Sequence, residues 1–461
     1  MSSSTNDILL LQLEDKEEHS TNPRTGTKII DNRDSANKPK TVETSLWGDS
    51  TRKQIAILTF LLMLQIFVSC CASIHVAFFT RVVLEKGGSV LHAAIILQIY
   101  TAATTVFGPI FGKFQHKFGS RNLIFAGSGI CGICQALLGT LQYVNNLVLF
   151  IAVGIALRFL TGIGNSAYNT AATTIACQEF PEHVSKVFGF LQAASGCTLF
   201  VAPALGGVLY EYFGMFMPLA TAGGIVVGSM SFQYFVFPDY SEINKNKQQE
   251  PDKFNSCTFL LDPLVIGILC VVGIGSGVFG YCEVALTTYF DERNLSTSYA
   301  GAALFAIGVS YAIFSSLTGY VISWKPNIRP HSLILGLMGI GGVMWLFSID
   351  QILGVVYFGA FLLGGFAGMC VVPAFEELLV IANKGIITKN TNTGIYSNVS
   401  GIWYANMGIG MTVIPIATSA IKDWTKSPFS ISFYGLSIFH IVCTSLLAIF
   451  MIYKRVRNRR N

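Results

Sequence analysis

The chain has 461 residues, of which 52% are hydrophobic and only 12% are charged, and its formal net charge is +5. An ordinary globular protein has about 25% charged residues, so this composition excludes a soluble domain of the usual kind. Apolar runs recur along the whole chain after Lys53 and indicate a helical protein that crosses a membrane many times. The basic residues lie at the ends of these runs rather than in one patch, which argues against nucleic-acid binding.

Twelve apolar segments are long enough to cross a bilayer, which takes about 20 helical residues. They fall six on each side of the longest internal polar stretch, so we predict an all-α membrane protein with two pseudo-symmetric six-helix bundles. The predicted spans are 54–78, 89–112, 121–143, 147–171, 184–209, 217–237, 263–289, 299–322, 331–349, 352–378, 397–420 and 429–453.

The predicted organisation is a bundle, a linker and a second bundle between two tails. The predicted parts are a disordered cytosolic tail at 1–50, a first bundle at 51–238, a cytosolic linker at 239–262, a second bundle at 263–453 and a basic cytosolic tail at 454–461. The halves resemble each other, because the interval from Gly112 to Gly319 is nearly equal to the interval from Pro203 to Pro415. Such duplication is common in transporters, whose substrate site lies between the repeats.

Lys and Arg near the span ends gather on one side of the predicted membrane, as Lys113, Lys186 and Arg329 do. By the positive-inside rule this side is cytosolic, and with it both termini and the linker. The loop after the seventh span lies on the opposite side, where Asn294-Leu-Ser fits a glycosylation acceptor. We expect a multi-pass protein of a vesicle or plasma membrane.

Three patches resemble the major facilitator superfamily. The loop after the second span resembles its G-x-x-x-D-R-x-G-R signature, with His116 in place of the acid that fastens the loop to a neighbouring helix in the family. The fourth span resembles the R-x-x-x-G-x-G signature of proton-coupled members, and the fifth resembles the antiporter signature. The residues that carry the first and third patches, which the resemblance implicates in gating, are Gly112, His116, Lys117, Gly119 and Arg121, and Gly189, Pro203, Gly206 and Gly207.

Within that superfamily the chain is most similar to the vesicular amine transporter branch, and specifically to its polyamine-transporter-like members. The similarity includes Gly206-Gly-Val-Leu-Tyr210, Pro238-Asp-Tyr240, an acid in the seventh span and Pro373-Ala-Phe-Glu-Glu377. It implies proton-driven export or vesicular loading of organic cations. The acid that binds amines in the first span of the monoamine members has no evident match near His75, which argues against a monoamine substrate.

Two ionisable residues fall inside apolar spans. Arg158 is the only Lys or Arg deep in a predicted span, and helical spacing places it on one stripe with Gly162, Asn165 and Asn169. Glu283 lies in the seventh span, and a desolvated carboxyl there is suited to hold a proton or an ammonium in turn. A permanent ion pair between Arg158 and Glu283 is the structural alternative.

Further candidates for substrate binding or proton coupling lie in other spans. Glu376 and Glu377 are adjacent and point about 100° apart on a helix, so one of the two faces the cavity, and the sequence does not decide which. Tyr311 and Tyr404 offer aromatic rings for cation–π contact with an ammonium. His75 is a candidate proton carrier, with a buried structural histidine as the alternative.

The sequence has no Walker motif, no catalytic triad pattern and no metal-ligand cluster, so we expect neither an enzyme nor a cofactor. The expected partners are a small organic cation, protons and the lipid bilayer, with no nucleic acid, and the expected state is a monomer. The leading hypothesis is a proton-coupled antiporter of polyamines or other amines. The alternatives are a facilitator for an organic anion or a neutral solute, with Arg158 as the ligand group, and a sensor of the same fold without transport.

Overall fold

The computed structural model describes residues 51–237, 256–291, 293, 297–349, 353–383, 393–425 and 429–460. The N-terminal tail and most of the predicted linker lie outside these residues, as does Asn294. In several helical stretches only the backbone is described, and the side chain of Glu283 falls in one of them. All regular elements of the described residues are helices.

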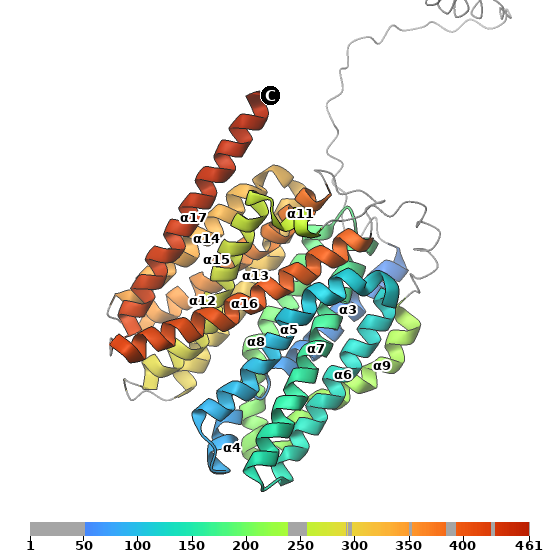
Figure 1. The fold of residues 1–461 in the computed structure, drawn as a ribbon, viewed down its shortest axis with the longest axis vertical. Helices are drawn as coiled ribbons and strands as arrows, with labels where there is room; N and C mark the ends of the chain where they lie inside the picture. Colours follow the sequence, from blue (N-terminus) through green and yellow to red (C-terminus); the bar gives the residue numbers. More distant parts are fainter. Residues whose placement is uncertain are drawn as a thin grey trace, which may run out of the picture. The chain divides into compact units, whose positions relative to one another are not determined.

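One long helix is present for each predicted span (Figure 1). Eleven of the long helices among the described residues are long and apolar enough to cross a membrane, and α9 adds a helix of 21 residues. The chain is therefore a multi-pass membrane protein. The N-terminal half has α3 (Arg52–Ser73), α5 (Val90–Phe118), α6 (Ser120–Thr140), α7 (Leu147–Glu179), α8 (Val184–Phe213) and α9 (Phe216–Val236); the C-terminal half has α12 (Pro263–Asp291), α13 (Thr297–Trp324), α14 (Arg329–Ser348), α15 (Leu353–Ala382), α16 (Thr393–Thr425) and α17 (Phe429–Arg460).

Three short segments refine the predicted boundaries. The first span ends early, because α3 stops at Ser73, residues 74–78 form tight turns, and the short helix α4 (Phe79–Glu85) follows. The described end of the predicted linker contains the short helix α11 (Ser256–Leu260). The last helix continues to Arg460, so the backbone of the predicted basic tail extends α17.

Two helix pairs join the halves. Helix α5 packs along α16, and α8 packs along α13. Within the halves, α6 packs on α7 and α9, while α14 packs on α15 and α17. We call the end at which α7 and α15 finish and α8 and α14 begin the basic end, because Lys186 and Arg329 lie there.

Glycines bring the backbones of the two joining pairs into contact. A Cβ built at Gly112 of α5 would lie 2.7 Å from the Ser397 carbonyl oxygen of α16, and one at Gly189 of α8 would lie 2.7 Å from the Ser315 carbonyl oxygen of α13. A Cβ at Gly319 would fall against the carbonyl oxygen of Ser185. Such contacts are closer than a side chain permits, so small residues are required here.

These contacts repeat with the spacing seen in the sequence. The contact of Gly112 with Ser397 has its counterpart in the contact of Gly319 with Ser185. The glycines of the two contacts are separated by the Gly112–Gly319 interval, and the serines by the same interval as Pro203 and Pro415. The predicted duplication of a six-helix unit is thus confirmed at the level of individual backbone contacts.

A second pair of contacts obeys the same two intervals. A Cβ at Gly401 of α16 would fall against the carbonyl oxygen of Gly108 of α5, just as one at Gly189 falls against that of Ser315. Gly401 stands as far after Gly189 as Pro415 does after Pro203, and Ser315 stands as far after Gly108 as Gly319 does after Gly112. The two crossings therefore have equivalent pairs of backbone contacts, with the contributions of the two halves exchanged.

Replacement of Gly189 by alanine should loosen the α8–α13 crossing. Because the new methyl group would meet a backbone carbonyl, the helices must separate, and we expect a loss of about 1–3 kcal/mol of stability. Thermal unfolding of the purified protein measures this. Gly224→Ala is the matched control, because a Cβ at Gly224 meets nothing within 4 Å; equal loss in both variants would contradict the prediction.

Candidate transport pathway between the halves

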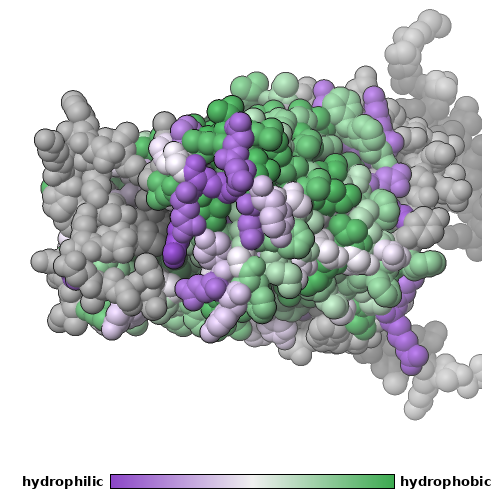
Figure 2. Space-filling model, turned by 90° about the horizontal axis from the view of Figure 1, so that it is seen from below, coloured by the Kyte–Doolittle hydropathy of each residue, from purple (hydrophilic) through white to green (hydrophobic). Residues whose placement is uncertain are grey.

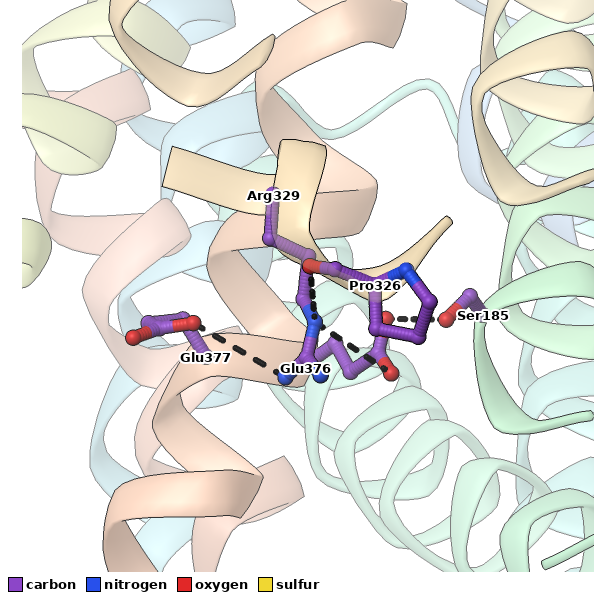
Figure 3. Close-up of polar contacts among 5 residues, drawn as sticks. All are labelled: Ser185, Pro326, Arg329, Glu376 and Glu377. Carbon is purple, nitrogen blue, oxygen red and sulfur yellow. Dashed lines mark hydrogen bonds and ion pairs between the residues drawn. The ribbon is translucent and has the colours of Figure 1, made fainter. Parts of the chain in front are cut away.

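A largely buried carboxylate, that of Glu376, lies between the two halves at the basic end. Glu376 of α15 accepts a hydrogen bond from the hydroxyl of Ser185, which belongs to α8 of the other half (Figure 3). Its second oxygen lies 3.8 Å from Nε of Arg329, at the start of α14. The Glu376 side chain is only 12% exposed. Its carboxylate therefore has partners from both halves.

Glu377, the adjacent acid, has different surroundings. Its Oε2 lies 3.8 Å from Nη1 of Arg329, and its side chain is 22% exposed. Of the two acids between which the sequence did not decide, Glu376 thus contacts the N-terminal half through Ser185 (Figure 3).

Three aromatic rings form a second contact between the halves, about one turn further from the basic end. Phe188 of α8 stacks on Phe375 of α15, with 4.0 Å between the ring centroids. Trp403 of α16 packs edge-on against both rings, at 6.1 Å from Phe188 and 5.6 Å from Phe375. All three side chains are at most 1% exposed. We call this group the aromatic layer.

Two tyrosine hydroxyls bridge the halves next to the aromatic layer. The Gln192 side chain of α8 donates to the Tyr311 hydroxyl of α13, at 3.2 Å. The Tyr404 hydroxyl of α16 and the Thr173 hydroxyl of α7 lie 3.0 Å apart. The structure thus places both predicted tyrosines at the interface, although their predicted contact with an ammonium stays untested.

A cluster of amides follows, near the middle of the helices of the N-terminal half. Gln65 of α3 donates through Nε2 to Ser195 Oγ at 2.6 Å and to Asn169 Oδ1 at 3.2 Å, and Asn169 donates to Asn165 Oδ1 at 2.9 Å. We call these four residues the amide cluster. Gln65 Oε1 accepts no hydrogen bond from the described residues. Asn169 lies one turn from Thr173, and Ser195 one turn from Gln192, so the cluster adjoins the tyrosine bridges.

Arg158 is buried inside the N-terminal half. Its side chain is 2% exposed, and its guanidinium carbon lies 4.5 Å from the centroid of the Tyr100 ring on α5. Nε and Nη1 have no hydrogen-bond partner among the described residues. The cation–π contact with Tyr100 therefore supplies part of the stabilisation that an ion pair would otherwise give. Of the rest of its predicted stripe, Gly162 packs against the Tyr100 carbonyl, and Asn165 and Asn169 join the amide cluster.

His75 lies in the turns between α3 and α4 and is fully buried. Neither ring nitrogen has a hydrogen-bond partner among the described residues. Two glycines of the antiporter-like patch meet this segment: a Cβ at Gly206 would fall against the carbonyl oxygen of Ile74, and one at Gly207 would lie 3.7 Å from Ala77. Both follow Pro203 in α8, so this patch closely packs α8 against the end of α3.

The segment predicted as a loop after the second span is helical up to Phe118, so His116 and Lys117 lie in the last turn of α5. His116 and Lys117 are exposed, whereas Gln115 is fully buried and links three helices. Gln115 donates to Ser120 of α6 at 2.8 Å and accepts from Thr174 of α7 at 3.2 Å. Gly119 has φ 78°, a backbone conformation that favours glycine, and it allows α6 to start directly with Ser120, next to Arg121.

A cavity of about 540 Å³ lies at the end opposite to the basic end. It is lined within the N-terminal half by residues around α4 and the end of α8, among them Lys86, Gln142 and Tyr210. On the face seen from below, hydrophilic side chains lie within a largely hydrophobic surface (Figure 2). The exposed pair Arg81–Glu85 also lines the cavity, and its hydrogen bond raises the pKa of Arg81. The lining does not include the amide cluster.

The sequence is similar to those of known membrane transporters. Residues 55–380 match the family model of the Major Facilitator Superfamily. The chain belongs to the major facilitator superfamily. It is 28% identical to the MFS-type transporter SLC18B1 of Mus musculus, over 79% of this chain and 80% of that protein. It is 23% identical to the synaptic vesicular amine transporter of Homo sapiens, over 72% of this chain and 61% of that protein.

Among solved structures, the human organic anion transporter MFSD10 (TETRAN) is similar in fold, with a TM-score of 0.66 and 16% identity. The similarity covers 86% of this chain and 99% of MFSD10. This similarity confirms the predicted major facilitator fold. Because the chain belongs to the major facilitator superfamily, it is a membrane transporter. The role of each individual site residue stays a prediction.

Several interface residues were missed by the sequence reasoning. Ser185 and Phe188 stand among ordinary helix residues and carry no pattern that distinguishes them, whereas Phe375 lies within the Pro373–Glu377 segment without having been singled out. Gln65 had a usable signal, because it is a lone amide inside the apolar run of α3. Gln192 had a similar one in α8.

Loss of the Phe188 ring should destabilise the aromatic layer. Phe188→Ala leaves a cavity against Phe375 and Trp403 that the packed helices cannot refill, so we expect a loss of about 3–5 kcal/mol. Thermal unfolding in detergent is the measurement. Phe232→Ala is the control, because Phe232 is 65% exposed; the prediction fails if the Phe188 variant unfolds at the same temperature as the Phe232 variant.

Proposed function

We propose that this transporter exchanges organic cations, polyamines first, for protons by alternating access between its two halves. The observation that carries the proposal is the amide cluster. It offers uncharged oxygen acceptors at mid-depth, beside the interface of the halves, where transporters of this architecture bind substrate. Ammonium groups donate several hydrogen bonds and suit such acceptors, with Gln65 Oε1 available for one of them.

The placement of Arg158 favours a cation over an anion. An organic anion would need a cationic ligand group, but the Arg158 guanidinium packs on Tyr100 within the N-terminal half. The similarity to a synaptic vesicular amine transporter supports the same substrate class. A facilitator for an organic anion or neutral solute is the alternative, and a sensor without transport is the second.

Carboxyls within membrane-spanning helices supply groups for proton coupling. Glu283 of α12 is our candidate for the exchanged proton, because a carboxylate in a span can hold either a proton or an ammonium. Tyr311 and Tyr404 are candidates for guiding the cation past the aromatic layer. We place the basic end and both termini in the cytosol by the positive-inside rule.

In this mechanism the described conformation is closed toward the basic end. The aromatic layer and the tyrosine bridges separate the amide cluster from that end. The two halves then rock about the cluster, so that the α5–α16 and α8–α13 crossings open on one side while contacts on the other side close.

Proteoliposomes with an acidic interior should accumulate labelled spermine, because outward proton flow drives exchange. Collapse of the pH gradient with nigericin should remove the accumulation. A monoamine and an organic anion are offered in parallel, and protein-free liposomes are the control. Uptake of the anion alone, or spermine entry that ignores the gradient, would support a facilitator; no uptake of any solute by correctly inserted protein would support the sensor.

The Glu283→Gln variant in the same vesicles tests the coupling group. Gradient-driven accumulation should disappear, and exchange of labelled for unlabelled spermine should weaken, because the neutral amide holds neither a proton nor an ammonium. Unchanged accumulation would show that another group couples the proton.

Gln65→Leu should weaken cation binding while leaving the fold intact, since leucine has a similar size and no hydrogen-bonding group. The loss of one or two hydrogen bonds predicts a KM about ten-fold higher. Thr59→Ala on the same helix is the control, because the Thr59 hydroxyl bonds only its own helix. An unchanged KM for Gln65→Leu would remove the amide cluster from the binding site.

A further inference from the structure

The hydrogen bond between Ser185 and Glu376 joins the halves at the basic end (Figure 3). We propose that this bond is a proton-sensitive latch: ionised Glu376 holds the basic end closed, and its protonation from that side releases Ser185 and favours opening. The proposal rests on the proposed function, since a closed and an open basic end presuppose alternating access. Glu376 is then protonated or ionised according to the pH on the side of the basic end, whereas Glu283 remains the candidate for the exchanged proton.

Ser185 is positioned to transmit the release. Its carbonyl oxygen lies against Gly319 of α13, and its hydroxyl reaches Glu376 of α15. Ser185 is 2% exposed. The start of α8 is thus held by two helices of the other half, and separation of the α8–α13 crossing must break the hydrogen bond.

The charges around Glu376 set the direction of the effect. Among the described residues, the ionisable groups near it are Arg329 of α14 and Glu377 of its own helix, which are charged, and the neutral thiol of Cys177 of α7. Lys186, next to Ser185 on α8, has its ammonium 4.8 Å from the centroid of the Tyr320 ring. An ionised Glu376 attracts Arg329 and accepts a charge-assisted bond from Ser185, which is about twice as strong as a neutral one. Protonation removes the first interaction and weakens the second, so it favours the open basic end.

The duplicated scaffold provides a matched control. Ser397 of α16 corresponds to Ser185 by the Pro203–Pro415 interval, and its backbone contacts Gly112 as that of Ser185 contacts Gly319. The Ser397 hydroxyl instead donates to the carbonyl oxygen of Gly394 in its own helix, at 3.2 Å. The equivalent serine thus occupies the same kind of crossing without a bond to the other half.

Native cysteines report the state of the latch. Cys177 is 1% exposed and lies in the last turn of α7 at the basic end, near Glu376, so opening of that end should uncover it. The experiment measures alkylation of Cys177 in the full-length protein in lipid nanodiscs, peptide by peptide, relative to the exposed Cys257. The ratio cancels the change of thiolate fraction with pH that both cysteines share. Ser185→Ala, which keeps the Glu376 carboxyl, separates the exposure of Cys177 from the effect of the Glu376 charge on its thiol. Cys131, buried in α6 at 1% exposure, reports on global unfolding.

In the wild type, the Cys177 ratio should rise about ten-fold between neutral and mildly acidic pH, as expected when a hydrogen bond to a charged group is lost. Glu376→Gln should give the high ratio at both pH values. Ser185→Ala should raise the ratio at neutral pH, while Ser397→Ala should behave as the wild type.

A low ratio in Glu376→Gln at neutral pH, or a pH response that persists in this variant, would overturn the latch. If Cys131 reacts in the Glu376 variant, the protein has unfolded, and the comparison of Ser185→Ala with Ser397→Ala decides. Alkylation requires no substrate. If the alkylation results contradict the latch, the uptake experiment still tests the proposed function. If no uptake is found, the alkylation results still test the latch.

Discussion

The close approach of backbones at two helix crossings is the constraint on which the rest of this structure depends. In lipid, apolar side chains gain little from meeting each other rather than the acyl chains, so helices are held together by close packing and by hydrogen bonds. At Gly112 and Gly401 of one crossing, and at Gly189 and Gly319 of the other, no side chain separates the backbones. The aromatic layer, the tyrosine bridges and the Ser185–Glu376 bond all lie within a few turns of these glycines, and they require the crossings to be intact.

The scaffold is symmetric, but the side chains on it are not. By the interval that relates Pro203 to Pro415, Phe188 of α8 corresponds to Ser400 of α16, and Gln192 corresponds to Tyr404. The amide cluster belongs to the N-terminal half, whereas Glu283, Glu376 and Glu377 belong to the C-terminal half. Duplication explains how two equal sets of helices came to cross in the same way. The divergence of the polar residues then assigns uncharged acceptors to one half and carboxyls to the other.

The sequence predicted the features that depend on length, apolarity and glycine spacing. The long helices start close to the predicted spans, although α5, α7 and α17 run six to eight residues beyond the predicted ends, and the two repeat intervals recur in backbone contacts. The rotation of each helix was not predictable, because most of these helices are apolar on all sides and a lipid-facing side chain resembles a buried one. The choice between Glu376 and Glu377 was open for this reason. The roles of Ser185 and Phe188 could not be predicted from the sequence, because both residues act through contacts with residues in the other half of the chain.

One face of α8 connects the basic end to the amide cluster. Ser185, Phe188, Gln192 and Ser195 follow one another at intervals of three or four residues, which places them along one side of the helix. In that order they contact Glu376, the aromatic layer, Tyr311 and Gln65. A helix with intact backbone hydrogen bonds moves largely as one body, so a shift at Ser185 also displaces Ser195 relative to α13. In the proposed mechanism, the opening of the basic end is therefore mechanically linked to the shape of the amide cluster through α8, without any chain of charges between Glu376 and that cluster.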